Sequence, residues 1–445
     1  MTQIEDLYKA FLEHQEVTTD SRVCPEGSIF FALKGETFNG NLFALKALEQ
    51  GCSYAVVDED VEGTEGNPRI FRVEDSLKAL QMLAKYHRKQ LGTPILAITG
   101  TNGKTTTKEL TSAVLSKKYN VLFTQGNFNN HIGVPKTLLR LTKEHELAVV
   151  EMGANHPGEI KTLVNIAEPD FGIITNVGRA HLLGFGSFEG VIHTKGELYD
   201  FLREKGGTVF INESNPHLMG ISDGLKLVKY KGQSQQSNDS ASQQTSPYVR
   251  FSFEGKEIET HLIGAYNADN MMAAATIGRY FNVPTDDILQ ALADYEPSNN
   301  RSQLMQTKDN TLIVDAYNAN PTSMKAALDN FRQLKAGNKM VVLGDMRELG
   351  EESLNEHLDV IGQLKDSDIK TIWLVGEEFK KAFEQSAGQQ VDESKCQCCG
   401  NEVCWKFFPS VEKVVAELHS STVKDKTILV KGSNSTRLYT LVSEL

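Results

Sequence analysis

A glycine-rich turn between a predicted strand and a predicted helix is the stretch of this chain best suited to chemistry. Ile95–Ile98 is a continuous apolar run typical of a buried strand, and Lys104–Ser116 can form a helix. Between them the chain reads G-T-N-G-K-T, from Gly100 to Thr105. Backbone N–H groups at a helix N-terminus attract phosphate, Lys104 adds positive charge, and the Thr105 hydroxyl suits magnesium. We therefore predict a nucleotide-phosphate site, the alternative being a turn without a ligand.

Two further polar side chains follow predicted strands. Glu151 comes directly after the apolar run Leu147–Val150, and His181 lies shortly beyond Phe171–Ile174. Ligands gather at the carboxyl ends of strands in open α/β sheets, so we expect both side chains to converge on the phosphate site. A carboxylate beside Thr105 suits magnesium, although this ion prefers oxygen to imidazole nitrogen. A structural role is the alternative for His181, but its glycine-rich surroundings favour function.

Other polar segments are less specific. The stretch Asn127–Asn130 reads N-F-N-N, and three amides in four positions suit either a loop that positions ligand oxygens or a set of turns. Lys195 stands near the start of a predicted helix and, from composition alone, is expected to be a solvated surface lysine. The polar loops around Ser21-Arg22 and Lys34-Gly35 could hold a diphosphate and a nucleobase, or be ordinary turns.

The elements that position these residues divide the chain into three α/β units. Residues 1–90 read as a small α/β unit, and strands alternate with helices from 91 to 304, which is typical of a mostly parallel sheet. Residues 305–445 predict a second open sheet. Its expected strands are Leu312–Val314, Met340–Leu343, Thr371–Val375 and Thr427–Val430. A polar tract, Gln233–Pro247, predicts a flexible loop.

Composition limits the function. The 445 residues carry a net charge of −12, which argues against a broad nucleic-acid surface. No apolar run approaches the ~18 residues of a membrane helix, and Met1–Leu12 does not resemble a signal peptide, so we expect a cytoplasmic protein. We also expect a monomer. Cys24 and Cys52 are expected to be reduced. The cluster Cys396, Cys398, Cys399 and Cys404 predicts either a zinc site or a loop of reduced thiols.

Several motifs along the whole chain resemble those of the Mur ligase family, the amide-forming ligases of peptidoglycan precursor synthesis. They occur in the family's order: G-T-N-G-K-T, N-x-N-N-x-x-G-x-P, E-M-G-A, N-V-G-x-A-H, K-G-E, Y-N-A-D-N, D-A-Y-N-A-N-P-T-S-M, L-G-D-M-R-E-L-G and K-G-S. Asp315–Met324 and Leu343–Gly350 resemble the members that add D-alanyl-D-alanine to UDP-N-acetylmuramoyl-tripeptide. The resemblance implies a UDP-binding N-terminal domain, a central P-loop ATPase domain and a Rossmann-like C-terminal domain.

The resemblance also implies roles for individual residues, with ATP and Mg²⁺ as cofactors. Binding of the ATP phosphates falls to Gly100, Thr101, Asn102, Gly103, Lys104, Thr105 and Thr106. The metal set is Thr105, Glu151, His181 and a carbamylated Lys195. Asn267 and Asn270 would lie against adenine, while Arg301 and Asp315 would bind the γ-phosphate and the ribose. The substrate set is Ser21, Arg22, Lys34, Gly35, Asn127, Asn129, Asn130, Tyr317, Asn318 and Asn320, and the catalytic set is Lys104, Lys195, His181 and Arg301.

Amide formation from a carboxylate requires a better leaving group, which suggests the mechanism. We expect the tripeptide carboxylate to attack the γ-phosphate, giving an acyl phosphate that the amine of D-alanyl-D-alanine then attacks. The alternatives are a sister ligase that adds a single amino acid and a nucleotide-dependent binding protein. Two departures from the family pattern stand out: Asn39 replaces a usual aspartate, and Asn434 replaces the arginine of K-G-S-R. The third residue of the tripeptide is not encoded in any readable motif.

Overall fold

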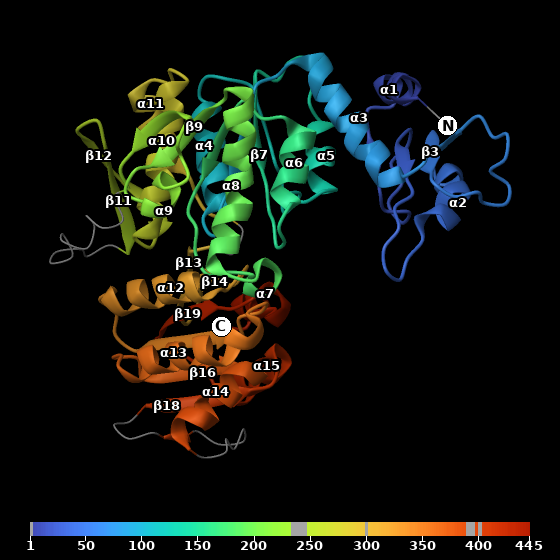
Figure 1. The fold of residues 1–445 in the computed structure, drawn as a ribbon. Coiled ribbons are helices and arrows are strands. Elements are labelled where there is room, and N and C mark those ends of the chain that lie inside the picture. Colours follow the sequence, from blue (N-terminus) through green and yellow to red (C-terminus); the bar gives the residue numbers. More distant parts are fainter. Residues whose placement is uncertain (1–2, 233–246, 299–300, 389–396, 399–402) are drawn as a thin grey trace.

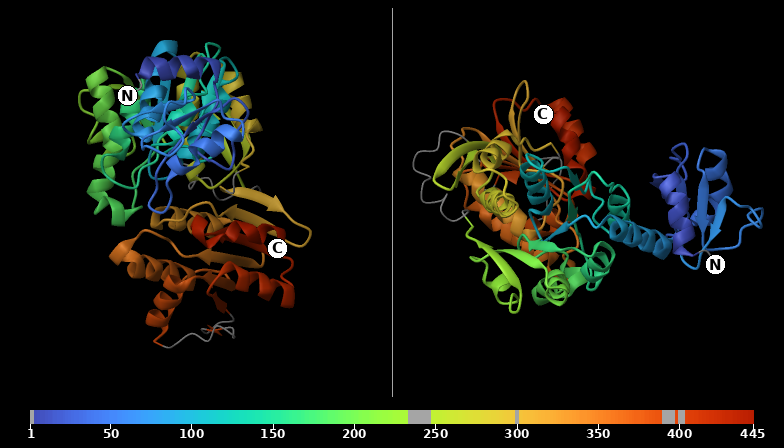
Figure 2. Two further views of the ribbon diagram at one scale, coloured as in Figure 1. Left: turned by 90° about the vertical axis from the view of Figure 1, so that its right-hand side faces the viewer. Right: turned by 90° about the horizontal axis from the view of Figure 1, so that it is seen from above.

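Three α/β units form an angled molecule, which confirms the predicted fold class. The computed structural model describes residues 3–232, 247–298, 301–388, 397–398 (backbone only) and 403–445. In Figure 1 the C-terminal unit, in orange and red, lies below the central unit, and the blue N-terminal unit projects to one side. Seen from above, in Figure 2, the N-terminal unit stands clear of the other two and is joined to them by helix α3.

The N-terminal unit is built on a parallel four-stranded sheet of order β1-β2-β3-β4. Apolar side chains such as Phe30, Phe31 and Val56 are fully buried in this sheet, as the predicted strands require. The elements are β1 (Val17–Thr18), β2 (Ile29–Phe31), β3 (Tyr54–Val57), β4 (Ile70–Arg72), α1 (Ile4–Glu13), η1 (Gly40–Phe43), α2 (Ala44–Glu49) and α3 (Ser76–Leu91).

Helix α3 is the arm that carries this unit, and ion pairs fix its far end to the central unit. Asp75 caps its first turn by accepting a hydrogen bond from Lys78 N, and Gly92 ends it in the left-handed conformation. Near that end Lys85 and Lys89 lie 3.1 and 3.2 Å from Glu168, at the end of α6 (Glu159–Ala167). Buried apolar side chains of α3 join those of the central unit in one core, so the arm is anchored by both packing and charge.

The central unit is a parallel six-stranded sheet of order β10-β9-β8-β5-β7-β6, with an antiparallel hairpin β11-β12 beside it. Its strands are β5 (Ile95–Thr99), β6 (Val121–Phe123), β7 (Leu147–Glu151), β8 (Phe171–Ile174), β9 (Thr208–Asn212), β10 (Lys226–Tyr230), β11 (Tyr248–Phe253) and β12 (Lys256–Ile263). The remaining helices are α4 (Lys104–Leu115), α5 (Gly133–Leu138), α7 (Leu182–Phe185), α8 (Phe188–Lys205), α9 (Pro216–Met219), α10 (Tyr266–Tyr280) and α11 (Thr285–Asp294).

The strand order explains how separate parts of the chain reach one site. β5 lies between β7 and β8, all three parallel, so their carboxyl ends meet at one edge. That edge receives the glycine turn after β5, Glu151 at the end of β7, and the Thr175-Asn176 segment after β8. Helices α4 and α10 pack tightly beside it: a Cβ at Gly278 of α10 would lie 2.3 Å from Val114 Cγ1 of α4.

The C-terminal unit is a seven-stranded sheet of order β13-β14-β19-β15-β16-β18-β17, antiparallel only at the edge strands β13 and β17. The strands are β13 (Gln303–Gln306), β14 (Thr311–Asp315), β15 (Lys339–Gly344), β16 (Thr371–Val375), β17 (Gln397–Cys398), β18 (Cys404–Phe408) and β19 (Thr427–Lys431). The helices are α12 (Pro321–Gln333), α13 (Ser353–Lys365), α14 (Glu377–Ala387), α15 (Val411–Ser420) and the short η3 (Gly350–Glu352), η4 (Asn434–Thr436) and η5 (Leu438–Ser443).

The structure adds detail that the sequence pattern did not give. β13 spans the boundary predicted at 304/305 and joins the third sheet, so we place the start of the C-terminal unit just before Gln303. The predicted start of a helix at Thr194 is wrong, because α8 begins at Phe188 after a Ser187 cap and Lys195 lies in its interior.

Some expectations fall outside the described residues. These are the polar tract, apart from Pro247, and both Cys396 and Cys399. Cys404 is disulfide-bonded rather than reduced, whereas Cys24 and Cys52 are free thiols as expected. No helix in the described part of the chain combines the length and apolar character needed to cross a bilayer.

The close approach of α4 and α10 predicts opposite effects of two glycine-to-alanine substitutions in helices. Gly278→Ala should lower the free energy of unfolding by about 1–3 kcal/mol, because the new methyl group overpacks the contact with Val114. Gly362→Ala in α13 is the matched control, since its Cβ would meet no atom within 4 Å, and it should be neutral or stabilising by about 0.5–1 kcal/mol. Urea unfolding of the full chain measures both. Equal effects would contradict the packing described here.

Candidate active site

A cavity of about 830 Å³ lies between the central and C-terminal units, at the carboxyl edge of the central sheet. The central unit contributes the glycine turn, the end of β7 and the start of α10, and the C-terminal unit contributes the segment after β14. Most of the predicted site residues line it: Thr101, Asn102, Gly103, Lys104, Thr105, Thr106, Asn127, Asn129, Asn130, Glu151, His181, Asn267, Asn270, Arg301, Asp315, Tyr317 and Asn318. The predicted residues outside the lining are Gly100, Lys195, Asn320, Ser21, Arg22, Lys34 and Gly35.

The glycine turn requires its glycines. Gly100 and Gly103 have φ angles of +144° and +77°, which favour glycine. A Cβ at Gly100 would lie 2.0 Å from Thr175 Oγ1, and one at Gly103 would lie 2.5 Å from Asn270 Oδ1. The turn is therefore held against β8 and α10, with the N-terminus of α4 facing the cavity.

Lys104 bends back over this turn. Its Nζ donates hydrogen bonds to Gly100 O at 2.8 Å and Thr101 O at 3.0 Å. Burial, with a smaller contribution from Arg301, lowers the pKa of Lys104 to about 8, while Glu151 opposes the shift. The side chain thus remains mostly protonated at neutral pH and is available to an anion in the cavity.

Glu151 is the most constrained group of the site. Only 1% of the residue is exposed, and its Oε1 accepts hydrogen bonds from Thr105 Oγ1 at 3.2 Å and from Asn129 Nδ2 at 2.8 Å. Its Oε2 is buried and has no hydrogen-bond partner among the described residues. A buried carboxylate oxygen without a partner is costly, and a cation beside it would remove the cost. This arrangement fits a magnesium ion held by one carboxylate, a hydroxyl and substrate phosphates.

His181 lines the same cavity as Glu151, whereas Lys195 lies outside that lining, and the surroundings of the two side chains differ. The His181 ring lines the cavity, and its Nδ1 hydrogen-bonds with Glu348 of the C-terminal unit. Burial lowers the pKa of His181, although Glu348 partly offsets this. The expectation of a solvated Lys195 is wrong: it is 2% exposed and lies in the interior of α8, a helix that packs against α6 and β8. Its Nζ donates to Ala154 O at 3.1 Å and lies 5.1 Å from the centre of the Phe185 ring.

The wall formed by α10 is a chain of amides. Asn270 Nδ2 donates to Asn267 Oδ1 at 2.8 Å, and Asn270 Oδ1 accepts from Thr107 Oγ1 at 3.1 Å. The Arg301 guanidinium stacks over the Tyr317 ring, 3.9 Å from its centre, and its buried Nε has no partner among the described residues. Flat polar groups and a cation thus face the space beside the glycine turn.

The C-terminal unit places two ordered contacts in the site. Lys431, which is 1% exposed, donates to Asp315 Oδ2 at 2.6 Å, and so ties the end of β14 to the end of β19. Asn320 caps α12 by accepting from Ser323 N, and its Nδ2 donates to Asn102 Oδ1 at 2.8 Å. Asn320 therefore touches the glycine turn itself instead of facing open space.

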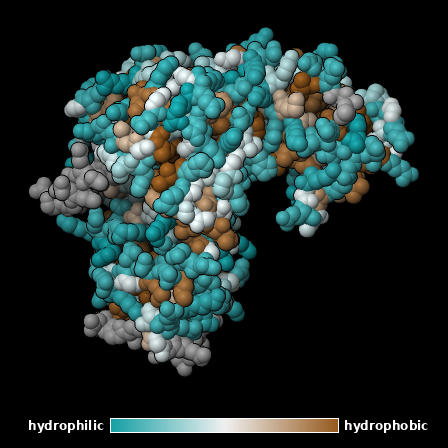
Figure 3. All heavy atoms as spheres, in the orientation of Figure 1, coloured by the Kyte–Doolittle hydropathy of each residue, from teal (hydrophilic) through white to brown (hydrophobic). Residues whose placement is uncertain are grey.

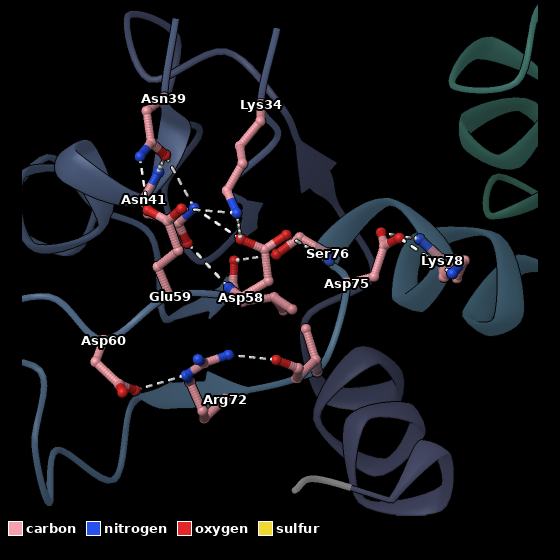
Figure 4. A network of polar contacts seen from close by, with 12 residues as sticks. Lys34, Asn39, Asn41, Asp58, Glu59, Asp60, Arg72, Asp75, Ser76 and Lys78 are labelled. Carbon is pink, nitrogen blue, oxygen red and sulfur yellow. Dashed lines mark hydrogen bonds and ion pairs between the residues drawn. The ribbon is translucent and has the colours of Figure 1, made fainter.

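The loops of the N-terminal unit form a separate polar network, away from the cavity. Figure 4 shows Lys34 between two carboxylates, at 2.9 Å from Asp58 and 2.8 Å from Glu59. These contacts, chiefly the one with Glu59, raise the pKa of Lys34. Asn39 donates to Glu59 Oε2 at 2.6 Å and accepts from Asn41 N, so an aspartate here would bring two carboxylates together. Asparagine at position 39 is therefore compatible with the neighbouring carboxylate of Glu59.

Ser21 and Arg22 lie in another loop of this unit. Arg22 Nε and Nη2 donate hydrogen bonds to Asp20 Oδ1 and Oδ2, at 2.9 and 2.8 Å. These hydrogen bonds lower the pKa of Asp20. Figure 3 shows the concave angle between the N-terminal unit and the rest of the molecule, with apolar side chains among polar ones along it.

The sequence did not single out two residues that the structure places in the site. Asn176 Oδ1 accepts from Asn102 N at 3.0 Å, and Asn176 Nδ2 donates to Asn102 O at 3.0 Å, so this side chain shapes the glycine turn. Lys431 supplies the cation beside Asp315. Lys431 is the last residue of β19, and Asn176 follows β8. Both therefore lie at carboxyl ends of strands, and this position was the signal that could have identified Asn176.

Together these features define an α/β nucleotide-dependent enzyme with an anion-binding turn, a carboxylate ready for a cation, and a second unit closing the cavity. Three family models match the chain in order: "Mur ligase family, catalytic domain" over residues 13–88, "Mur ligase middle domain" over 98–278, and "Mur ligase, glutamate ligase domain" over 300–434. The chain belongs to the Mur ligase family, whose members are ATP-dependent ligases.

Individual relatives match most or all of the chain. The UDP-N-acetylmuramoyl-tripeptide--D-alanyl-D-alanine ligase of Bacillus subtilis strain 168 is 36% identical over 81% of this chain and 79% of its own length. The enzyme of the same name from Escherichia coli K12 is 33% identical over 100% of this chain and 98% of its own. A crystal structure of MurF from Acinetobacter baumannii matches 100% of this chain and 98% of its own, with a TM-score of 0.82 and 28% identity.

The unpartnered oxygen of Glu151 leads to a prediction. Glu151→Gln should leave the free energy of unfolding of the ligand-free protein unchanged or raise it by about 1 kcal/mol, because a buried charge is removed. The same substitution should abolish most of the stabilisation that Mg²⁺ with ADP gives, because the cation loses its carboxylate. Urea unfolding with and without Mg²⁺ and ADP measures both effects. Glu259→Gln, on an exposed strand position, is the control. Loss of ligand-free stability with unchanged ligand stabilisation would contradict this assignment.

Proposed function

We propose that this chain joins D-alanyl-D-alanine to UDP-N-acetylmuramoyl-tripeptide at the expense of ATP, in the synthesis of peptidoglycan precursors. The observation that carries the proposal is a single cavity whose walls combine a phosphate-binding turn, Glu151 and the Asp315–Asn318 segment of another unit. Relatives of this name match nearly the whole chain at about one-third identity, which supports the choice of substrates.

The phosphates of ATP bind at the N-terminus of α4. Backbone N–H groups of Gly103 to Thr106 face them, and Lys104 exchanges its two carbonyl partners for phosphate oxygens. Arg301, held by Tyr317, lies where it can neutralise the transferring phosphoryl group. Asn267 and Asn270 border the adenine. Gly100 and Asn102 act by shaping the turn.

Asp315 is assigned to the ribose. Its Oδ2 accepts from Lys431, so its orientation is fixed before any nucleotide arrives. The other carboxylate oxygen is left to accept hydrogen bonds from ribose hydroxyl groups.

Glu151 Oε2 and the Thr105 hydroxyl, with His181 nearby in the cavity lining, would hold a magnesium ion. When bound, Mg²⁺ supplies positive charge that neutralises the phosphate oxygens during transfer. Asn129 and Thr105 hold one oxygen of the Glu151 carboxylate, which leaves Oε2 available to a cation.

Lys195 becomes a metal ligand only if its ammonium is converted to a carbamate, and its surroundings favour that change. Burial, reinforced by the charge of Lys104, lowers the pKa of Lys195 to about 7. A substantial fraction of the side chain is then a neutral amine at neutral pH, the form that attacks carbon dioxide. The carbamate carries a negative charge that Lys104 and the metal compensate.

The reaction proceeds by activation of the tripeptide. Its terminal carboxylate attacks the γ-phosphate, giving an acyl phosphate and ADP; the amine of D-alanyl-D-alanine then attacks the carbonyl carbon, and phosphate leaves. Tyr317 and Asn318 border the incoming dipeptide, while Asn127 and Asn130 border the tripeptide. Closure by the C-terminal unit, to which Asn320 contributes through Asn102, excludes water from the acyl phosphate.

The UDP end of the substrate is assigned to the N-terminal unit. Ser21 and Arg22 in one loop, with Lys34 and Gly35 in another, supply hydroxyl, cationic and backbone groups for the diphosphate. Lys34 is already paired with Asp58 and Glu59, so an anionic ligand must compete with them. We further propose that the protein acts as a monomer in the cytoplasm, with a mass near 49.3 kDa by sedimentation.

Phosphate release from ATP tests the function. With Mg²⁺, UDP-N-acetylmuramoyl-tripeptide and D-alanyl-D-alanine, we expect release coupled to a UDP-linked pentapeptide detected by mass. Lys104→Ala should lower the rate by at least about 100-fold, because the phosphoryl group in transfer loses a cation that neutralises its negative charge. Release with a single amino acid and a shorter UDP-peptide would instead identify a sister ligase. Release that depends only on a macromolecular partner would identify a nucleotide-dependent binding protein.

The carbamate on Lys195 has its own test. With ¹³C-labelled bicarbonate, the protein should give a carbamate carbon signal in NMR, which grows as the pH rises through about 7 because the neutral amine then increases. Lys195→Gln should lack the signal. Lys226→Gln, which alters an exposed lysine of β10, is the control. A signal that persists in Lys195→Gln, or that is absent at pH 8 in the unsubstituted chain, would contradict the proposal.

A further inference from the structure

Two residues with unusual backbone conformations meet across the boundary between the central and C-terminal units. His181, just before α7, has a φ angle of +50°, and Glu348, in the loop before η3, has a φ angle of +62°. Residues other than glycine rarely adopt this region, and such strain is retained where surrounding contacts impose it. The two side chains contact each other through His181 Nδ1 and Glu348 Oε2, and Leu183 N donates to Glu348 O at 3.3 Å.

The loop that carries Glu348 is held firmly within the C-terminal unit. Asp345, only 1% exposed, accepts from the backbone N–H groups of Glu378 and Phe379 at 3.2 and 3.1 Å. Met346 N donates to the buried His357 ring at 3.1 Å, and Arg347 N donates to Ser433 Oγ at 3.2 Å. Three consecutive residues before Glu348 are therefore fixed, so its position follows that of the whole unit.

The contact also determines which nitrogen of His181 faces the site. Glu348 occupies Nδ1, whereas no described residue hydrogen-bonds with Nε2, and the ring lines the same cavity as Glu151 and Lys104. A carboxylate on one imidazole nitrogen fixes the tautomer and the orientation of the ring, and makes the other nitrogen a better ligand. In this chain the carboxylate comes from a different unit than the histidine.

We propose that Glu348 is a positioning residue that the C-terminal unit supplies to the metal–nucleotide site, by holding His181 with Nε2 toward the cavity. The inference rests on the proposed function, because it takes the cavity to be the Mg²⁺–ATP site. It follows that the cation site is complete only when the C-terminal unit is docked. Metal binding and closure of the cavity are then coupled through the hydrogen bond between His181 and Glu348.

An ion pair across the same boundary provides a matched control. Arg179 Nη1 lies 3.3 Å from Glu356 Oε1, the Arg179 side chain is 62% exposed, and neither residue hydrogen-bonds with His181. Glu356→Gln removes a charge pair between the same two units and leaves the Glu348 contact intact. A general weakening of docking should affect both variants equally, whereas loss of the oriented imidazole should affect only Glu348 variants.

The experiment uses the full chain with ADP and measures Mn²⁺ binding, as a probe for the cation, by titration calorimetry. Glu348→Ala should weaken Mn²⁺ binding by about 10–100-fold, and Glu348→Gln should give a smaller loss because its amide oxygen can still accept from Nδ1. Glu356→Gln should stay within about twofold of the unsubstituted chain. In the ligation assay, Glu348→Ala should lower kcat more than it raises the KM for D-alanyl-D-alanine.

The outcomes separate this inference from the proposed function. Mn²⁺ affinity of Glu348→Ala within about twofold of the unsubstituted chain, or equal losses in the Glu348 and Glu356 variants, would overturn the inference and leave the function intact. An unsubstituted chain that fails to bind Mn²⁺ with ADP would overturn the proposed metal site and the inference together. Thermal unfolding of each variant establishes that it is folded, and Glu348→Gln decides the question if Glu348→Ala is not.

Discussion

The site depends on one buried carboxylate. Glu151 ends a strand whose side chains are all buried, and one of its oxygens is satisfied by Thr105 and Asn129 while the other has no partner in the described part of the chain. The unpartnered oxygen stays buried because β7 pairs with β5 on one side and β6 on the other, so the strand that carries Glu151 is fixed inside the sheet. A cation bound beside the free oxygen would offset the free-energy cost of burying that oxygen without a partner. The glycine turn, the amide-bearing loop and α10 are all arranged around that position.

The cavity is also a product of assembly between units. The central sheet supplies groups that bind phosphate, but Asp315, Tyr317 and Lys431 come from the C-terminal sheet. Asn320 touches the glycine turn and Glu348 touches His181, so the second unit contacts the nucleotide site at two points. Such contacts suit a reaction whose activated intermediate must be kept from water. Helix α3 joins the N-terminal unit, which projects to one side, to the central unit (Figure 1).

Sequence reasoning predicted the local parts of this design well. The strand before Gly100, the helix after it and Glu151 at the end of β7 follow from apolar runs and turn residues, which depend on neighbours along the chain. Convergence of these parts followed from the rule that parallel strands present their carboxyl ends at one edge. The strands predicted at residues 95–98, 147–150 and 171–174 were placed within one residue. Among the described elements, β1, β6, β13, β18 and helices α5, α6, α9 and α14 were not anticipated.

The failures concern contacts between distant segments. Lys195 looked like a surface lysine because lysine usually is one, and only the packing of α8 against α6 and the central sheet buries it. Lys431 and Asn320 belong to motifs that were noted, but their partners lie more than 100 residues away. The same holds for Asn39, whose replacement of an aspartate makes sense only beside Glu59. No local pattern encodes such pairs.

The central claim is that the cavity transfers phosphate from ATP to the tripeptide carboxylate before the amide forms. The most direct measurement follows ¹⁸O from the terminal carboxylate of UDP-N-acetylmuramoyl-tripeptide during ligation of D-alanyl-D-alanine in unlabelled water. An acyl-phosphate route leaves one ¹⁸O atom in each phosphate released, because the carboxylate oxygen departs with phosphorus. Unlabelled phosphate accompanying pentapeptide formation would contradict the account.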